Sequence, residues 1–271
     1  MKLLNGRELA SYIQQRQVQQ VRGLLQAHEM QPKLAIVQVK DDPVINTYVR
    51  LKKAYGAVIG VSVESHHPAQ EDIAKVIQKL NDDPSVHGII VQLPLVDPSQ
   101  TDQVVNSVSP NKDVDALGTN PKFEPATPMA IMWLLAGFNV SLKGKQVLLI
   151  GRGKLVGQPL ERLLKESGID VRIADRQTKD LASETKTADV IITAAGSPAL
   201  LFSDMVKEGA VVVDAGVASE DGKTVGDVAP ELYERDDLTI TPAKGGVGPL
   251  TVCALFENVI RAATRMGGED A

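Results

Sequence analysis

Aromatic side chains and cysteines are scarce in this chain of 271 residues. Phe, Trp and Tyr make up 3% of it, so the core has to be aliphatic, as is usual for buried parallel sheets. Cys253 is the single cysteine, which excludes an internal disulfide and favours a reducing compartment. No apolar run is long enough to span a bilayer, and the N-terminus lacks the apolar segment of a signal peptide. We therefore expect a cytoplasmic protein with no membrane partner.

Positive charge and metal-ligand patterns are also lacking. The net charge is −5, which argues against a nucleic-acid partner. The four histidines (His28, His66, His67 and His87) show no ligand spacing, so we expect no metal site. No Gly-x-Ser-x-Gly elbow is present, which disfavours an acyl-enzyme hydrolase.

Apolar strand-like runs alternate with helical patterns along the whole chain, which predicts parallel sheets with helical crossovers. The expected strands are 34–39, 61–64, 88–92, 146–150, 170–174, 189–193, 210–214 and 238–241. A polar stretch from Ser109 to Pro128 separates the two halves. Thr127-Pro128 predicts the start of one helix, and a final helix is expected from Pro249. The expected fold class is α/β, with two Rossmann-like parallel-sheet domains flanking a cleft.

A glycine-rich loop follows the expected strand 146–150. Gly151, Gly153 and Gly157 lie in Gly-Arg-Gly-Lys-Leu-Val-Gly, and helical spacing begins at Pro159. A strand, a glycine loop and a helix in this order bring backbone N–H groups up to a phosphate. The pattern is one residue longer than the standard dinucleotide fingerprint, so it indicates a nucleotide without proving one.

Two neighbouring residues of opposite charge stand where the ribose of a dinucleotide would be recognised. Asp175 favours the free 2′-hydroxyl of NAD, whereas Arg176, together with Arg152, favours the 2′-phosphate of NADP. We favour NADP and leave NAD open.

Five residues of the first half have side chains suited to chemistry, although each also has an ordinary structural interpretation. Tyr48 and Lys52 share one helix face at i,i+4 spacing, but Arg50 and Lys53 beside them suit a solvated basic face. Gln92 ends an apolar strand and either positions an amine or closes the strand. In Lys112-Asp113-Val114-Asp115, either carboxylate suits a bidentate contact with an amidine-like group, or both solvate a linker.

Taken together, seven motifs resemble the bifunctional methylenetetrahydrofolate dehydrogenase/methenyltetrahydrofolate cyclohydrolase family, and they span nearly the whole chain. They are Tyr48-Val-x-x-Lys52, Val86-His-Gly-Ile-Ile-Val-Gln-Leu-Pro-Leu95, Pro110-x-Lys-Asp-Val-Asp115, Thr127-Pro128, Gly151-Arg-x-x-x-Val-Gly-x-Pro159, Gly226-Asp-Val228 and Gly245-Gly-Val-Gly-Pro-Leu-Thr251. The chain departs from the family pattern at several positions; one is Ala116, where the family usually has Gly.

The resemblance implies two reactions: oxidation of 5,10-methylenetetrahydrofolate with NADP, then hydrolysis of the methenyl product to 10-formyltetrahydrofolate. It implies that Lys52 is the catalytic acid/base, that Gln92 tunes it, that Tyr48 packs on the folate ring and that Asp115 holds the pterin. Leu93, Pro94, Gly248 and Pro249 would line the folate site. The expected dinucleotide contacts are Gly151, Arg152, Gly153, Val156, Gly157, Asp175, Arg176, Ala195, Gly196, Gly216 and Val217.

The same resemblance implies the domain ranges and the assembly. Residues 1–120, joined by a C-terminal helix 249–271, would form the folate-binding catalytic domain, and residues 121–248 the dinucleotide-binding domain. A homodimer with a role in purine biosynthesis is expected. The alternatives are a monofunctional NAD-dependent dehydrogenase, a non-catalytic dinucleotide-binding regulator and a shikimate-type NADP dehydrogenase. The Gln-Leu-Pro-Leu and Gly-Gly-Val-Gly-Pro motifs argue against the last of these.

Overall fold

A six-stranded parallel sheet holds most of the strands of the second half of the chain. The computed structural model describes residues 1–220 and 223–268. The strand order is β1-β11-β8-β7-β5-β6, and every neighbouring pair is parallel. The strands are β1 (Lys2–Leu3), β5 (Val147–Ile150), β6 (Val171–Ala174), β7 (Val190–Thr193), β8 (Val211–Asp214) and β11 (Thr239–Ile240).

Helix α5 (Ala126–Gly137) precedes the first strand of this half, β5, and the later helices lie between successive strands; one short hairpin is added. The later helices are α6 (Gly157–Glu166), α7 (Leu181–Thr187), η3 (Ser203–Met205) and η4 (Pro230–Glu234). The antiparallel hairpin pairs β9 (Ala218–Glu220) with β10 (Lys223–Val225).

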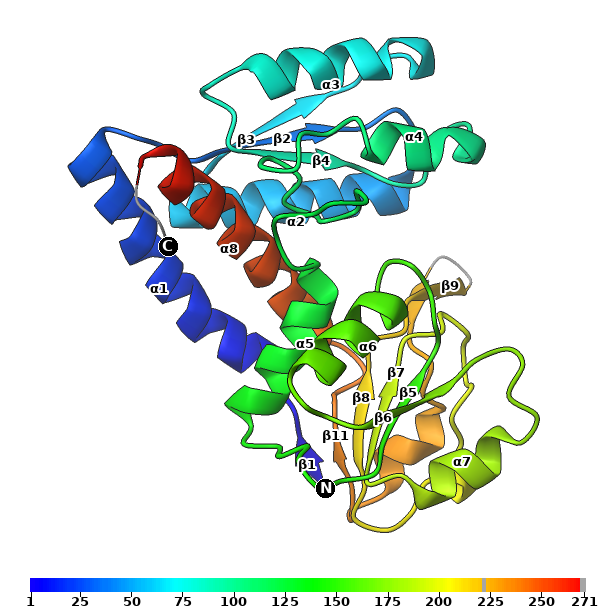
Figure 1. Cartoon of the computed structure of the whole chain (residues 1–271). Helices are drawn as coiled ribbons and strands as arrows, with labels where there is room; N and C mark the ends of the chain where they lie inside the picture. Colours follow the sequence, from blue (N-terminus) through cyan, green and yellow to red (C-terminus); the bar gives the residue numbers. More distant parts are fainter. Residues whose placement is uncertain (221–222, 269–271) are drawn as a thin grey trace. The chain divides into compact units, whose positions relative to one another are not determined.

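A second parallel sheet, with the order β3-β2-β4, is built from the first half of the chain. Figure 1 shows α2 and α3 on opposite faces of this sheet. The elements are β2 (Lys33–Val37), α2 (Pro43–Ile59), β3 (Ser62–His66), η1 (Gln70–Asp72), α3 (Ile73–Asp82), β4 (Gly88–Val91), η2 (Pro98–Gln100) and α4 (Thr101–Val105). The two long helices are α1 (Gly6–His28) and α8 (Val247–Met266). The α/β fold with two parallel sheets is therefore confirmed.

The chain divides into two compact units. One contains residues 1–10 and 127–251, and the other contains residues 11–126 and 252–271. The expected domain ranges and these units differ for residues 1–10, 121–126 and 249–251. The first ten residues lie with the six-stranded sheet because β1 pairs with β11 (Figure 1). Within residues 1–220 and 223–268, no helix combines the length and apolarity needed to cross a membrane.

The core of each sheet is aliphatic, as the scarcity of aromatic residues predicted. All four residues of β5 and all four of β4 are buried. Strands that are apolar on both faces suit a sheet covered by helices on both sides. The carboxyl ends of β6, β5, β7 and β8 align, since Ile150 pairs with both Ala174 and Thr193, and Thr193 pairs with Asp214.

The expected strands are all present, with boundaries shifted by a few residues. Two helices begin earlier than expected: α5 at Ala126 and α8 at Val247. In both helices the proline lies inside the first turn. Backbone N–H groups there have no intrahelical acceptor, so the lack of an N–H on proline costs no hydrogen bond. β1 was not predicted, because two residues that pair with a strand more than two hundred positions away show no local periodicity.

Candidate functional site

Helix α2 carries Tyr48 and Lys52. Its first turn is held by Asp42, whose carboxylate accepts hydrogen bonds from the N–H groups of Val44 (2.9 Å) and Ile45 (3.3 Å). Ile45 and Val49 are buried and hold one face of the helix in place. Lys52 is half-buried, whereas its neighbour Lys53 is exposed. Lys52 therefore does not belong to the solvated basic face that the neighbouring Arg50 and Lys53 suggested.

The Lys52 ammonium lies at the end of β4. Its Nζ donates a hydrogen bond of 2.8 Å to Oε1 of Gln92, the residue after that strand. Burial lowers the pKa of Lys52, and the charge of Asp115 partly opposes this. Burial also raises the pKa of Asp115, and the charge of Lys52 opposes it. The structure thus brings three of the expected catalytic residues into one group, with the amine shifted towards its neutral form.

The loop that carries Asp115 is held in place by the two charged residues that precede Asp115 closely, Lys112 and Asp113. Lys112 Nζ donates to the carbonyl oxygens of Leu80 (3.0 Å), Asn81 (2.8 Å) and Asp83 (2.6 Å), where α3 ends. Asp113 is buried and accepts the N–H of Gly118 at 2.8 Å. Of the two carboxylates that the sequence left equivalent, Asp113 therefore serves the backbone and Asp115 faces the lysine.

The remaining expected folate residues are distributed over both units. Tyr48 is 38% exposed on α2. Leu93 is half-buried and Pro94 is exposed; they are joined by a cis peptide bond directly after Gln92. Gly248 and Pro249 lie in the first turn of α8, in the unit that holds the six-stranded sheet.

The glycine loop has the close packing that a dinucleotide loop needs. Gly151 has φ +105°, and a Cβ there would lie 2.5 Å from the carbonyl oxygen of Ala194. A Cβ on Gly157 would overlap the carbonyl oxygen of Gly151. Gly153 has open space around it. Gly151 and Gly157 therefore have to be glycines, because other backbone segments lie too close to them for a Cβ. Helix α6 begins at Gly157, and the preceding residue, Val156, has no side-chain acceptor to cap the first N–H groups of the helix. This fits a bound pyrophosphate.

The residues expected at the ribose follow β6. Asp175 and Arg176 are both exposed. Oδ1 of Asp175 accepts the N–H of Gln177 at 2.9 Å, so this carboxylate is partly used in its own turn. Nε of Arg152 donates to Glu161 Oε2 at 3.1 Å.

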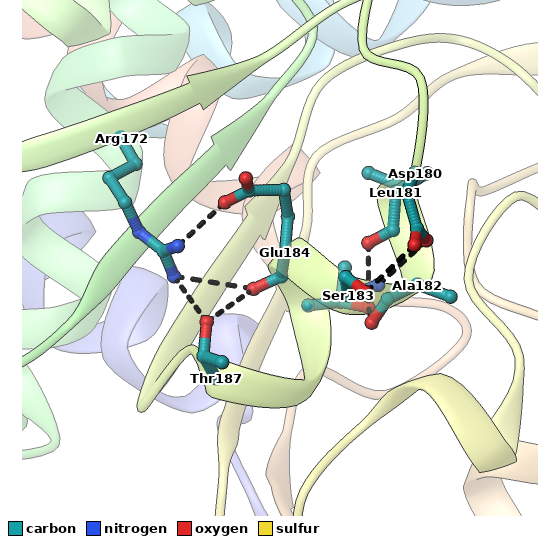
Figure 2. A network of polar contacts seen from close by, with 8 residues as sticks. Arg172, Asp180, Leu181, Ala182, Ser183, Glu184 and Thr187 are labelled. Atoms are coloured by element: carbon teal, nitrogen blue, oxygen red, sulfur yellow. Dashed lines mark hydrogen bonds and ion pairs between the residues drawn. The ribbon is translucent and has the colours of Figure 1, made fainter.

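Helix α7, which follows this turn, is held at both ends (Figure 2). Asp180 caps its start by accepting the N–H of Ser183 at 3.0 Å. At its end, Arg172 of β6 donates to the Glu184 carboxylate (2.6 Å), the Glu184 carbonyl (3.2 Å) and Thr187 Oγ1 (2.8 Å). Arg172 precedes the turn of residues 175–179 and Asp180 follows it, so these hydrogen bonds fix the chain on both sides of that turn.

The other expected dinucleotide residues follow the neighbouring strands. Ala195 and Gly196 come after β7, and Gly216 and Val217 come after β8. Two carboxylates between these loops, Asp214 and Asp227, were not assigned a role from the sequence. The Gly226-Asp-Val228 motif contained a signal for one of them, but nothing in its spacing indicated which loops it contacts.

No group of three or more His, Cys, Asp or Glu side chains suited to a metal ion occurs in the part of the chain that the structure describes.

Two family models match the chain in sequence. The catalytic domain of tetrahydrofolate dehydrogenase/cyclohydrolase matches residues 4–115, and its NAD(P)-binding domain matches residues 125–267. Together they cover both units almost completely.

Individual relatives match over nearly the full length. The chain is 38% identical to the bifunctional protein FolD of Lactobacillus acidophilus, over 99% of each chain. It is also similar to the crystal structure of the bifunctional FolD dehydrogenase/cyclohydrolase of Campylobacter jejuni, with 37% identity, a TM-score of 0.91 and coverage of 98% and 99%. The Trypanosoma brucei FolD structure, complexed with NADP cofactor and inhibitor, has 30% identity, a TM-score of 0.90 and 97% coverage of each chain.

Proposed function

Because the chain belongs to the tetrahydrofolate dehydrogenase/cyclohydrolase family, we propose that it catalyses both of that family's reactions. It oxidises 5,10-methylenetetrahydrofolate to the methenyl cation and hydrolyses this cation to 10-formyltetrahydrofolate. The observation that carries the proposal is the half-buried Lys52, hydrogen-bonded to Gln92 at 2.8 Å and electrostatically coupled to Asp115. All three residues lie within the range of the family's catalytic domain.

Lys52 acts as the proton acceptor in hydrolysis. A lysine whose pKa is lowered by burial has a larger neutral fraction at neutral pH and can serve as a base. Water adds its oxygen to the methenyl carbon and gives one proton to Nζ of Lys52, which leaves a neutral hydroxyl adduct. The bond between this carbon and N5 then breaks, N5 takes the hydroxyl proton, and the carbon becomes the formyl group on N10. Gln92 holds the amine in place during this transfer through its amide oxygen.

Tyr48 and Asp115 bind the substrate in this proposal. The exposed ring of Tyr48 offers a face on which the folate aromatic ring packs. The Asp115 carboxylate accepts two parallel N–H groups from the amidine-like edge of the pterin, a bidentate geometry that suits a carboxylate. Leu93 and Pro94, which follow Gln92 in the same unit, complete the lining of the folate site.

The glycine loop holds the nicotinamide dinucleotide. When bound, the dinucleotide accepts the hydride that the methylene carbon loses. Arg152, Gly153, Val156 and Gly157 bind the pyrophosphate through backbone N–H groups. The N–H of Gly151 donates to the Ala174 carbonyl at 2.8 Å, so Gly151 contributes by allowing the backbone to approach closely. The loops at Ala195–Gly196 and Gly216–Val217 line the same carboxyl edge of the sheet.

We propose NADP as the preferred form. Arg176 is exposed after β6, and the neighbouring Asp175 carboxylate accepts the Gln177 N–H. A 2′-phosphate gains a charge-assisted contact from this guanidinium. The T. brucei relative, which was solved with NADP, supports this choice. The carboxylate of Asp175, which suits the free 2′-hydroxyl of NAD, is the feature that favours NAD instead.

Location, assembly and pathway belong to the same proposal. A cytoplasmic homodimer that supplies 10-formyltetrahydrofolate to purine biosynthesis is what the family resemblance supports. Sedimentation of the purified protein tests the dimer.

The two activities are tested separately on the purified protein. The first assay follows reduction of NADP or NAD on adding 5,10-methylenetetrahydrofolate, and the second follows loss of the methenyl compound without any dinucleotide. We expect both activities, with NADP preferred. Hydride transfer without hydrolysis would leave the monofunctional dehydrogenase, and absence of both would leave a non-catalytic binding protein.

A further inference from the structure

Two carboxylates, the half-buried Asp214 and the buried Asp227, interlock the loops at the carboxyl edge of the six-stranded sheet. Asp214 is the last residue of β8, and Asp227 lies after the hairpin that follows it. Asp227 is completely buried. Each aspartate packs on a glycine next to the other: a Cβ on Gly216 would overlap the Asp227 carboxylate, and a Cβ on Gly226 would overlap that of Asp214.

The Asp227 carboxylate holds the loop after β7. Oδ2 accepts the N–H of Ala195 at 2.8 Å, and Oδ1 accepts the N–H of Ser197 at 2.7 Å. These two bonds surround Gly196, which has φ +63°. Both oxygens are therefore used on the backbone of the loop that carries Ala195 and Gly196.

The Asp214 carboxylate holds the loop after β8 and holds Asp227 itself. Its Oδ1 accepts the N–H groups of Gly216 (2.9 Å) and Asp227 (3.1 Å), and also the hydroxyl of Thr193 (3.1 Å). Its Oδ2 accepts the N–H of Val228 at 3.1 Å. The two loops and the ends of β7 and β8 are thus joined through two side chains.

Charged side chains aimed at backbone N–H groups give stronger hydrogen bonds than neutral ones. Such hydrogen bonds restrict the backbone conformations of the two loops. Without them, the glycine and alanine residues of these loops would leave the backbone many conformations. Pre-ordering a loop in its binding conformation lowers the entropy lost when a ligand binds.

We propose that Asp227, supported by Asp214, is a positioning residue for the dinucleotide: it holds the Ala195–Ser197 and Gly216–Val217 loops in the conformation that binds NADP(H). The inference rests on the proposed function, because it takes these loops as part of the dinucleotide site. Asp227 acts through the backbone and does not itself touch the ligand.

The test uses Asp227→Asn in the full-length protein. The amide has the same shape but offers one acceptor in place of two, so one of the two loop bonds is lost. We expect the KM for NADP and the dissociation constant of NADPH, followed by its fluorescence, to rise about tenfold, as the loss of one charged hydrogen bond implies. The dinucleotide-independent hydrolysis of the methenyl compound should stay within about twofold of wild type.

Asp189→Asn is the matched control. Asp189 precedes β7, at the opposite end from Thr193, and also accepts a backbone N–H, that of Gln146 at 2.7 Å. A merely structural role would lower the melting temperature of both variants and leave NADPH affinity unchanged in both. Unchanged NADPH affinity in Asp227→Asn overturns the inference.

Thr193→Val covers the case in which Asp227→Asn does not fold. It removes the hydroxyl that donates to Asp214 at 3.1 Å and also interacts with Asp227. We expect NADPH affinity to fall about threefold; no change would overturn the inference. The proposed function fails separately: a wild-type protein that binds NADPH but does not turn over folate contradicts the activity alone.

Discussion

Nζ of Lys52 lies 2.8 Å from Oε1 of Gln92, a residue forty positions later in the chain. Helix α2 supplies the amine, and the end of β4 supplies the amide. This contact separates Lys52 from the exposed cations beside it and makes it the first residue to test.

Lys52→Met should reduce hydrolysis of the methenyl compound at least about 100-fold, because the variant has no group to take the proton. Folate binding, measured by equilibrium titration, should persist, since the methionine keeps the shape of the side chain. The control is Lys53→Met, which removes an exposed charge on the same helix. Hydrolysis at the wild-type rate in Lys52→Met would remove this residue from the mechanism.

Asp115→Asn should move the acid limb of the hydrolysis pH profile to lower pH. The rate rises with pH as Lys52 loses its proton, and the pKa of Lys52 is lowered by burial but held up by the Asp115 charge. Without that charge the pKa falls further, so the neutral amine persists at lower pH. Each pH profile is normalised to its own maximum rate. The control variant Glu71→Gln removes an exposed carboxylate of the same unit, and its pH profile should show no shift.

Arg176→Ala should lower the catalytic efficiency with NADP by about tenfold, because a charge-assisted contact with the 2′-phosphate is lost. Efficiency with NAD, which has no such phosphate, should change little. Lys186→Ala removes an exposed cation of α7 and serves as the control. An equal loss with both cofactors would place Arg176 elsewhere than at the ribose.

Arg172→Met should destabilise the protein by about 1–2 kcal/mol, since it leaves the Glu184 carboxylate and the last turn of α7 without their partner (Figure 2). Chemical denaturation measures this free energy of unfolding. Glu166→Gln breaks an exposed pair with Arg162 and should cost less than about 0.5 kcal/mol. Similar values for both variants would contradict a specific role for Arg172.

Ala116→Gly should stabilise the protein by up to about 1 kcal/mol. Ala116 has φ +56°, a left-handed conformation that costs an L-residue about 1–2 kcal/mol, partly offset by the greater chain entropy of glycine. The opposite result is expected for Ala54→Gly in the exposed interior of α2, which should cost about 1 kcal/mol. A loss of stability in Ala116→Gly would show that this conformation carries no strain.

Local sequence patterns determined the strands, the glycine loop and the residue types available for chemistry. Apolar runs such as 147–150 form buried strands wherever helices cover both faces, and Gly151 and Gly157 are needed because two backbone segments approach each other there. Such features depend on neighbours along the chain, so they can be read without a fold.

Only the tertiary structure shows which of several similar residues contacts which partner, a choice that the local sequence patterns left open. Lys52 rather than Lys53 meets Gln92, and Asp113 rather than Asp115 binds the backbone. Likewise, Asp214 and Asp227 meet two loops because β7 and β8 end side by side. These roles arise from contacts between distant segments, and the burial and hydrogen bonding that such contacts create are absent from any local pattern of residues.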